Sequence, residues 1–465
     1  MSRAAQDRGT GLWKFSPSGV VSDIPIRRRF SRVLLFSIAA IFGFWLAFAA
    51  LQQWLVVHWE NEDNPRAWAR AARFEPSDAK MWWAVAIHYE RDPVYRSLPK
   101  AEECLQHAVH LVPSWYLYWD ELGKVQEELG KASQARQAYE RAEADAPQSA
   151  SAAWEYGSFL LRQGQPAAAA QQVRRALLRK VAFTGSAVQE FWRSGAGIST
   201  IVNQVLPPQR QTYLTTIGFF LTQQQDDDAL ACWKKLASLH LTVKLQQALP
   251  LIDDLIADSR IEDAHQVWMQ ALAASNSPER ASAAGSLIFN GNFEYGLVNG
   301  GFGWRQTPIP GAAFDLVTDV THGSSQSARV SFNGHHNLDY ANLFQDVAVE
   351  PGSRYRFSAF MRTEDISTDT GPQFVIYRCA DPGASLAETP PMTGTHPWTK
   401  VQLDLTTGSS TDCIKVVLSR RPSQLFSNRI RGMVWVDDVR LVKYAPRGTP
   451  GERFVRGKPV GKKSH

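Results

Sequence analysis

The sequence predicts a multidomain chain with a single transmembrane helix, an all-α helical-repeat solenoid and an all-β sandwich, in that order. The prediction depends on an uncharged apolar run, on a pattern that then recurs every 34 residues, and on a change of composition near Ser286. At 465 residues the chain has room for several domains. The expected parts are a basic cytoplasmic N-terminus (1–32), the transmembrane helix (33–57), the solenoid (60–285), the sandwich (286–445) and a disordered basic tail (446–465).

The apolar run Val33–Val57 contains no charged side chain. At about 1.5 Å per residue it can cross a bilayer core of about 30 Å. Charged residues flank it with opposite signs: Arg27, Arg28, Arg29 and Arg32 before it, and Glu60, Glu62 and Asp63 after it. The positive-inside rule then places the N-terminus in the cytoplasm. A cleaved signal peptide is the alternative, but its apolar core is usually shorter and is followed by a small-residue cleavage site. We therefore expect a single-pass protein of the bacterial inner (cytoplasmic) membrane, with periplasmic or extracellular C-terminal domains.

Charge and cysteine usage exclude several classes of function. The net charge of +5 comes from the two basic ends, and the remainder is mildly acidic, which does not indicate nucleic-acid binding. No C-x-x-C spacing is present, which argues against zinc and thioredoxin-like chemistry. Cys379 and Cys413 fall in strand-like runs of one predicted domain and could form a disulfide in an oxidising compartment. Cys104 and Cys232 lie in apolar helical patterns and are expected to be buried thiols.

A step of 34 residues relates matching positions in the helical region: Gly123 and Gly157, Gly130 and Gly164, Ala135 and Ala169, Tyr139 and Val173, and Ala142 and Ala176. The small residues would let two helices of a hairpin approach closely, and the larger ones would fill the groove between them. This pattern resembles the tetratricopeptide (TPR) repeat. After Ala176 the step breaks, so we expect an irregular insertion with two short helices over 177–207, followed by two further helix pairs.

The TPR resemblance implies an array that binds a partner protein of the cell envelope on its concave face. A second interpretation stays open, in which the array is a spacer, because no basic or aromatic cluster marks a groove. Other charged residues of the region are interpreted as solvated helical faces without a special role: His88, Glu90, Asp253 and Asp254.

From Ser286 onward, short alternating runs separated by Gly, Pro and Asn turns predict an antiparallel sandwich. The expected strands are Ala328–Phe332, Tyr355–Arg362, Phe374–Cys379, Trp398–Leu405, Cys413–Ser419 and Met433–Val442. Several landmarks come in a characteristic order: LIFNGNFE at 287–294, Gly303-Trp304, HGSSQSARV at 322–330, YRFSA at 355–359, WTKV at 398–401 and VWVDDV at 434–439. Together they resemble the CenC-like carbohydrate-binding modules of families 4, 9 and 22. The resemblance implies a jelly roll that binds a polysaccharide.

Sugars present apolar C–H faces beside hydroxyls, so a binding site needs an aromatic platform and planar hydrogen-bonding groups. By position in the family, Tyr340 is the candidate platform, in the loop after strand Ala328–Phe332, and Arg305 is the candidate sugar-contacting arginine. By chemistry alone, His336, Tyr377 and Arg378 are further candidates, together with His335. Trp304, Trp398 and Trp435 are expected in the core, since their neighbours alternate apolar.

The same resemblance implies a structural Ca²⁺ near the ends of the domain. Glu294 with Asp437 or Asp438 would supply the oxygen ligands that Ca²⁺ prefers. Alternation along a strand places Asp437 and Asp438 on opposite faces, so only one of them can point at Glu294.

No catalytic motif of the G-x-S-x-G, H-E-x-x-H or Walker type is present, so we do not expect an enzyme. The sequence predicts a non-catalytic, membrane-tethered envelope protein that binds a polysaccharide and a partner protein. The alternative is a protein-protein interaction scaffold whose sandwich is only structural.

Overall fold

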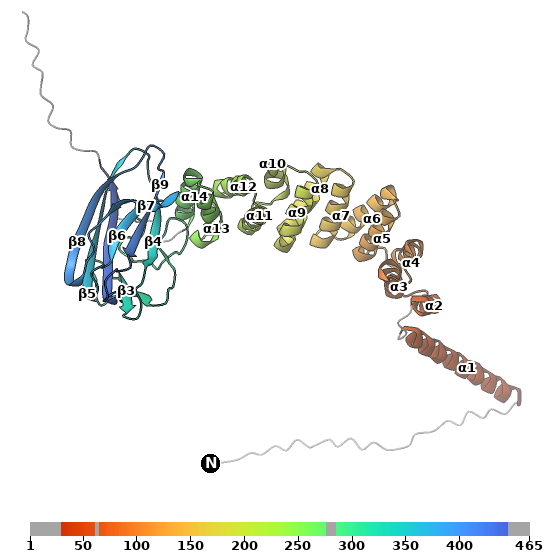
Figure 1. Cartoon of the computed structure of the whole chain (residues 1–465). Coiled ribbons are helices and arrows are strands. Elements are labelled where there is room, and N and C mark those ends of the chain that lie inside the picture. Colours follow the sequence, from red (N-terminus) through yellow and green to blue (C-terminus); the bar gives the residue numbers. More distant parts are fainter. Residues whose placement is uncertain (1–28, 61–64, 276–284, 445–465) are drawn as a thin grey trace, which may run out of the picture. The chain divides into compact units, whose positions relative to one another are not determined.

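The computed structural model describes residues 29–60, 65–275 and 285–444, shown in Figure 1. These residues form two compact units that divide after Ala146, and each unit is described by itself. The basic N-terminus and the basic tail expected from the sequence lie almost wholly outside the described residues.

The first unit begins with α1 (Arg29–Glu60). The most apolar stretch of its segment Val33–Trp59 has a mean hydropathy of 2.4, and none of that stretch is buried. Within the described residues it is the one helix that is long and apolar enough to cross a membrane. At its end, the Trp59 ring packs against Phe74 of α2 (Pro65–Phe74), with 5.0 Å between ring centroids.

Two helical hairpins complete the first unit: α3 (Ala79–Arg91) with α4 (Leu98–Leu111), and α5 (Tyr116–Glu128) with α6 (Ala132–Asp145). The carboxylate of Asp78 caps α3 by accepting hydrogen bonds from the amides of Lys80 and Met81. Gly123 of α5 faces the Tyr139 ring of α6, and a Cβ at this position would lie 3.0 Å from it. The close approach predicted from the small residues is therefore present.

The second unit opens with α7 (Ala150–Arg162) and α8 (Pro166–Arg179), where Gly157 faces Val173 in the same way. The prediction of two short helices over 177–207 is confirmed, but the predicted break in the repeat step is partly wrong. Helices α5, α7 and α9 (Thr184–Arg193) begin 34 residues apart, so α9 keeps the repeat step. Its partner is shortened to α10 (Ile198–Thr200) and a π-helical turn, η2 (Ile201–Val205). Two pairs follow as expected: α11 (Arg210–Thr222) with α12 (Asp226–Ser238), and α13 (Leu245–Ala257) with α14 (Ile261–Ala274).

The C-terminal part is a sandwich of two antiparallel sheets, with strand orders β1-β4-β9-β6-β7 and β2-β3-β10-β5-β8 (Figure 1). The strands are β1 (Arg305–Gln306), β2 (Ala312–Val317), β3 (Ser327–Asn333), β4 (Tyr340–Ala348), β5 (Arg354–Ile366), β6 (Gln373–Arg378), β7 (Asp381–Glu388), β8 (Gly394–Thr406), β9 (Cys413–Arg420) and β10 (Arg431–Lys443). Apolar side chains of both sheets form one core between them, which includes Phe357, Phe374, Val416 and Val436.

Each strand expected from the sequence is present, but β1, β2, β4 and β7 were missed. In β4 the alternation is hidden by Gln345, whose polar side chain points inward. It accepts a hydrogen bond from the Phe289 amide at 3.0 Å and donates one to the Phe289 carbonyl at 2.9 Å. Thus a buried glutamine holds the N-terminal segment of the domain against the sheet.

The first and last segments of the jelly roll run side by side. The Leu287 amide donates to the Leu441 carbonyl and the Val439 amide to the Gly291 carbonyl, both at 2.8 Å. The Leu441 amide also donates to Ser286 Oγ at 3.2 Å. We call these hydrogen bonds the terminal seam.

Arg420 organises one end of the sandwich. It is 0% exposed, and its guanidinium donates to the carbonyls of Thr370, Leu338 and Asn428 at 3.1, 2.6 and 3.0 Å. It also donates to Asn337 Oδ1 at 3.0 Å. Burial lowers the pKa of this guanidinium from its usual value. One side chain thus joins the loops after β3, β5 and β9.

The disulfide predicted between Cys379 and Cys413 is present, with 5.4 Å between the two Cα atoms. It links the end of β6 to the start of β9, which are neighbours in the first sheet. Cys104 and Cys232 are buried free thiols, and burial raises the pKa of Cys104 to about 12.

Candidate functional site

The outer face of the sheet β1-β4-β9-β6-β7 carries the most coherent group of polar and aromatic side chains. In register across three strands lie Asp346, Lys415 and Tyr377. Two residues away on the same face, Phe344 of β4 stands opposite Val417 of β9. We call Phe344, Asp346, Tyr377 and Lys415 the Lys415 cluster.

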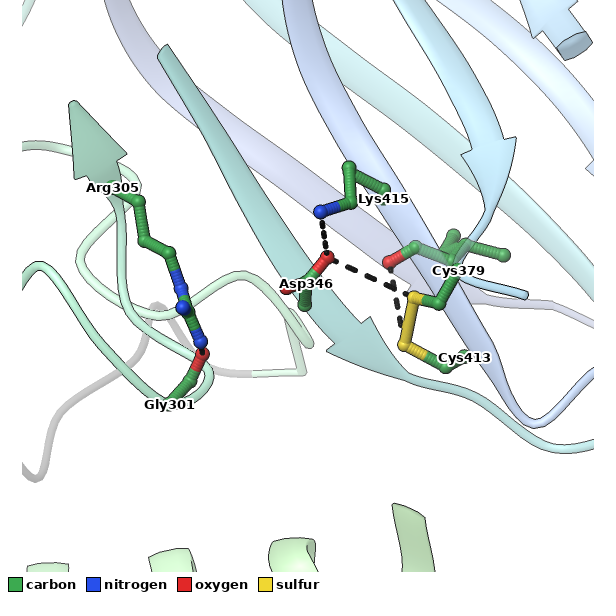
Figure 2. Close-up of a disulfide and its surroundings, with 7 residues drawn as sticks. Gly301, Arg305, Asp346, Cys379, Cys413 and Lys415 are labelled. Atoms are coloured by element: carbon green, nitrogen blue, oxygen red, sulfur yellow. Dashed lines mark hydrogen bonds and ion pairs between the residues drawn. A yellow bond between two sulfur atoms is a disulfide. The ribbon is translucent and has the colours of Figure 1, made fainter. Parts of the chain in front are cut away.

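Lys415 joins the members of this cluster. Its ammonium lies 3.1 Å from Asp346 Oδ1 and 4.2 Å from the centroid of the Phe344 ring. Asp346 Oδ1 also lies 3.8 Å from Cys379 Sγ, so the disulfide borders the cluster, as Figure 2 shows. Both aromatic rings are half-buried, which leaves part of each ring exposed. The arrangement offers two ring surfaces on either side of a lysine-carboxylate pair.

Tyr340 is not an exposed platform, which corrects the expectation from the family position. It is the first residue of β4, not part of a loop, and its ring is 1% exposed in the core. The ring meets Phe332 edge-on at 5.7 Å, and burial raises the pKa of the hydroxyl. A sugar cannot stack on this ring in the folded domain.

Arg305 is on the edge strand β1, directly opposite Phe344 in the register. Its guanidinium is engaged by the helical repeats, because Nη2 lies 2.7 Å from Asp253 Oδ1 of α13. It also donates to the Gly301 carbonyl at 3.0 Å (Figure 2). Two interpretations from the sequence change: the Arg305 guanidinium is paired within the chain, and Asp253 is not simply a solvated charge.

The structure does not bring the other candidates together. Tyr377 belongs to the Lys415 cluster. Arg378 forms an ion pair with Asp381 and lowers the pKa of that carboxyl. His336 is exposed in the loop after β3, where its carbonyl accepts a hydrogen bond from Ile430, near the Arg420 end of β9. Cys413 and the Lys415 cluster are at the other end of that strand.

Sequence reasoning missed three members of the cluster: Phe344, Asp346 and Lys415. The signal for Lys415 was in the predicted disulfide. If Cys379 and Cys413 are joined, the strands that contain them are neighbours, and alternation puts Lys415 near Tyr377. Phe344 and Asp346 gave no comparable signal, because β4 was not expected.

The expected tryptophan core is only partly present. Trp304 is buried in the core of the sandwich. Trp435 is also buried, but its neighbours Val434 and Val436 point into the core, so its ring lies on the outer face, with Arg362 at 5.2 Å. Trp398 is half-buried at the surface, 5.7 Å from His322.

The carboxylates expected to bind calcium contact one common loop. Asp437 is 0% exposed, and its Oδ2 accepts hydrogen bonds from the His322 amide at 2.7 Å and from Ser324 Oγ. Glu294 accepts two from Ser325, which lower the pKa of its carboxyl. Burial raises the pKa of Asp437. Asp438 turns away and pairs with Arg440 at 2.7 Å. Of the two aspartates, Asp437 thus faces the loop at 322–325 that Glu294 also contacts.

A different group of candidate ligand atoms, from Asp346, Cys379 and Cys413, lies within 4.8 Å. The thiolate form of cysteine is the metal ligand, whereas these sulfurs are joined in the disulfide. This group therefore does not fit a metal ion in the oxidised protein.

Known family models match both the helical part of the chain and the sandwich. Residues 121–187 match the tetratricopeptide repeat model, and residues 285–421 match the carbohydrate binding domain model. The chain combines TPR repeats with a carbohydrate-binding domain. Both are non-catalytic modules. No curated protein matches the chain at a significant level.

Parts of the chain also match solved structures at low identity. A crystal structure of MamA is 16% identical and covers 38% of this chain and 85% of that chain, with a TM-score of 0.25. A CBM4 structure is 17% identical and covers 34% of this chain and 99% of that chain, with a TM-score of 0.27. The TPR protein YrrB is 13% identical and covers 46% of this chain and 95% of that chain, with a TM-score of 0.25.

The carbohydrate-binding domain match includes Glu294 and the whole Lys415 cluster. It ends at residue 421, before β10 and the buried Asp437. The TPR match extends from α5 into α9, so it contains the helix that continues the 34-residue step.

Proposed function

We propose that the chain is a non-catalytic, membrane-tethered envelope protein that binds a polysaccharide through its carbohydrate-binding domain and a partner protein through its TPR repeats. The observation that carries this proposal is the Lys415 cluster, in which Phe344 and Tyr377 are partly exposed on either side of the Lys415–Asp346 ion pair. The role would be in synthesis, export or attachment of the polysaccharide. A tether makes a weak glycan contact effective, because it raises the local concentration of the binding site.

We place the anchor in α1 and the N-terminus in the cytoplasm of a bacterial inner membrane. The apolar segment Val33–Trp59 supports the anchor. The orientation is supported by arginines before this segment and acidic residues after it. Both domains with proposed binding roles would then be periplasmic or extracellular, where the Cys379–Cys413 disulfide is stable.

The chemistry of the cluster suits a sugar ring. An aromatic ring stacks on the apolar C–H face of a pyranose, and the ammonium and carboxylate between the rings can bond its hydroxyls. Because Asp346 is mostly buried and already paired, Lys415 would provide the freer polar contact. Affinity would therefore depend on the rings first and on Lys415 second.

Replacing Tyr377 by alanine should weaken glycan binding about tenfold or more, which corresponds to about 1.4 kcal/mol of binding free energy. Phe344→Ala should have a similar effect, because the rings are expected to act together. The measurement is binding of the full-length protein, in detergent or nanodiscs, to an array that includes bacterial envelope polysaccharides.

Two variants serve as matched controls for this experiment. Tyr340→Phe changes a buried ring of the same sheet, and Phe360→Ala removes an aromatic ring from β5 of the opposite sheet. Both should bind like the wild type. If Tyr377→Ala and Phe344→Ala both bind glycan as tightly as the wild type does, the Lys415 cluster is rejected as the site. Absence of binding to any glycan would favour the scaffold alternative, in which the sandwich is structural.

We also propose that Glu294 and Asp437 hold a structural Ca²⁺. The two carboxylates are joined through Ser324 and Ser325, and a cavity of 340 Å³ adjoins Asp437 and its loop. Ca²⁺ prefers hard oxygen ligands, and a cation would offset the burial of the Asp437 charge.

If this is correct, adding Ca²⁺ should raise the melting temperature of the full-length protein, and a chelator should reverse the increase. At an ion concentration of about 100 times Kd, the expected gain in stability is about 2.7 kcal/mol. Glu294→Gln should abolish the response, whereas Asp438→Asn should retain it, since Asp438 faces Arg440. Identical melting with calcium and with chelator would reject the site.

A further inference from the structure

The last helical pair of the TPR repeats packs on the start of the carbohydrate-binding domain. Asp253 Oδ1 of α13 accepts hydrogen bonds from the Gly301 amide and from Arg305 Nη2, both at 2.7 Å. Behind it, Trp268 of α14 meets Phe289 and Phe302 edge-on, with ring centroids 5.1 and 6.0 Å apart. Because Trp268 is 3% exposed, the contact has a packed apolar base with a charged group beside it.

Gly301 is required by this geometry. Its φ of +53° is unfavourable for other residues, and a Cβ would lie 2.8 Å from the Trp268 ring. The backbone is held in this conformation with its amide directed at Asp253. A backbone N–H and a guanidinium that converge on one oxygen form a typical carboxylate-binding arrangement. In this structure the carboxylate comes from the chain itself.

The occupant of this arrangement can exchange. The side chains of Arg305 and Asp253 are 23% and 36% exposed, and ion pairs that water reaches are weak. Arg305 also stands opposite Phe344 in the register, which places the arrangement at the edge of the Lys415 cluster.

We propose that the Gly301 amide and the Arg305 guanidinium are a carboxylate-binding site, that Asp253 occupies it in the absence of ligand, and that a uronate group of an acidic polysaccharide displaces Asp253. This inference builds on the proposed glycan function and specifies an acidic polymer as the ligand.

Displacement would connect the two domains. While Asp253 holds Gly301 and Arg305, the last helical pair is fixed by a charged contact as well as by Trp268. When a uronate takes the site, the charged contact is lost and only the apolar contact remains. Binding of an acidic glycan would thereby loosen the docking of α13 and α14, a change that the repeats can transmit to a bound partner.

The test uses the full-length protein with oligogalacturonate as the acidic probe and its methyl ester as the uncharged probe. Removing the internal competitor by Asp253→Ala should tighten binding of the acid about tenfold and leave binding of the ester unchanged. Asp253→Asn, which keeps the shape of the side chain, guards against an effect of misfolding and should change binding in the same direction. Asp254→Ala is the matched control, because Asp253, not Asp254, accepts both hydrogen bonds.

Hydrogen exchange supplies a second readout. The Gly301 amide should exchange faster in Asp253→Ala than in the wild type, and the acidic probe should restore its protection. This inference is overturned, and the glycan function stands, if Asp253→Ala leaves the affinities for the acid and the ester equally unchanged while Tyr377→Ala still weakens glycan binding. If no variant binds either probe and the glycan array is negative, both proposals fall.

Discussion

Removing the disulfide by the double substitution Cys379→Ala and Cys413→Ala should lower the free energy of unfolding of the carbohydrate-binding domain by about 4 kcal/mol. The two cysteines are separated by 34 residues in the sequence. A cross-link that closes a loop of this length restricts the unfolded chain by an entropy worth about 4 kcal/mol at room temperature. For a domain of this size, the melting temperature should fall by roughly 8 to 16 °C.

Thermal unfolding with and without a reductant checks this prediction. Reduction should lower the melting temperature of the wild type toward that of the double variant, and it should leave the double variant unchanged. Because the disulfide borders the Lys415 cluster, glycan binding should also weaken in the variant at temperatures below its melting point. A reductant-sensitive double variant would show that the effect has another cause.

Arg420→Met should destabilise the same domain by about 3 to 5 kcal/mol, because each buried acceptor left without a donor costs about 1 to 3 kcal/mol. Methionine keeps the unbranched apolar part of the side chain, but it cannot donate to the carbonyls of Thr370, Leu338 and Asn428. Arg420→Lys should have an intermediate effect, since an ammonium cannot reach acceptors on three loops in the geometry of a planar guanidinium.

The neighbouring residue supplies a matched control for this measurement. Arg421 forms an ion pair with Glu388 in which both side chains are about half exposed. Arg421→Met should change stability by less than about 1 kcal/mol, because such surface pairs contribute little. Denaturant unfolding followed by the fluorescence of the buried tryptophans would compare the two variants. Equal effects of the two substitutions would contradict the role assigned to the buried guanidinium.

Local sequence patterns predicted much of the fold. Gly123 and Gly157 identified the close helix pairs, because the space opposite a small residue is filled by its helical partner, Tyr139 or Val173. Strands such as β5 and β9 were recognisable from alternating or continuous apolar runs. The pairing of Cys379 with Cys413 followed from their places in two predicted strands. In each case the physical cause lies within a short stretch of chain.

The candidate site was harder to predict, because its members meet through contacts between distant segments. Tyr340 is an aromatic residue of the kind that can stack on a sugar, but at the start of β4 its ring points into the core. Arg305 is held by Asp253, which is 52 residues earlier in the sequence and belongs to the helical domain. No spacing rule relates these two residues. Position within the family pointed to Arg305 and Tyr340, which lie on two strands of one sheet, but it did not show which side chains are exposed.

The terminal seam has a mechanical consequence. Because the segment at Leu287 and the strand at Leu441 are hydrogen-bonded neighbours, the chain enters and leaves the jelly roll at nearly the same place. A pull between the repeats and the end of β10 would therefore load the seam first. In the path of the chain the sandwich is therefore a side branch, whose entry and exit lie together at one place.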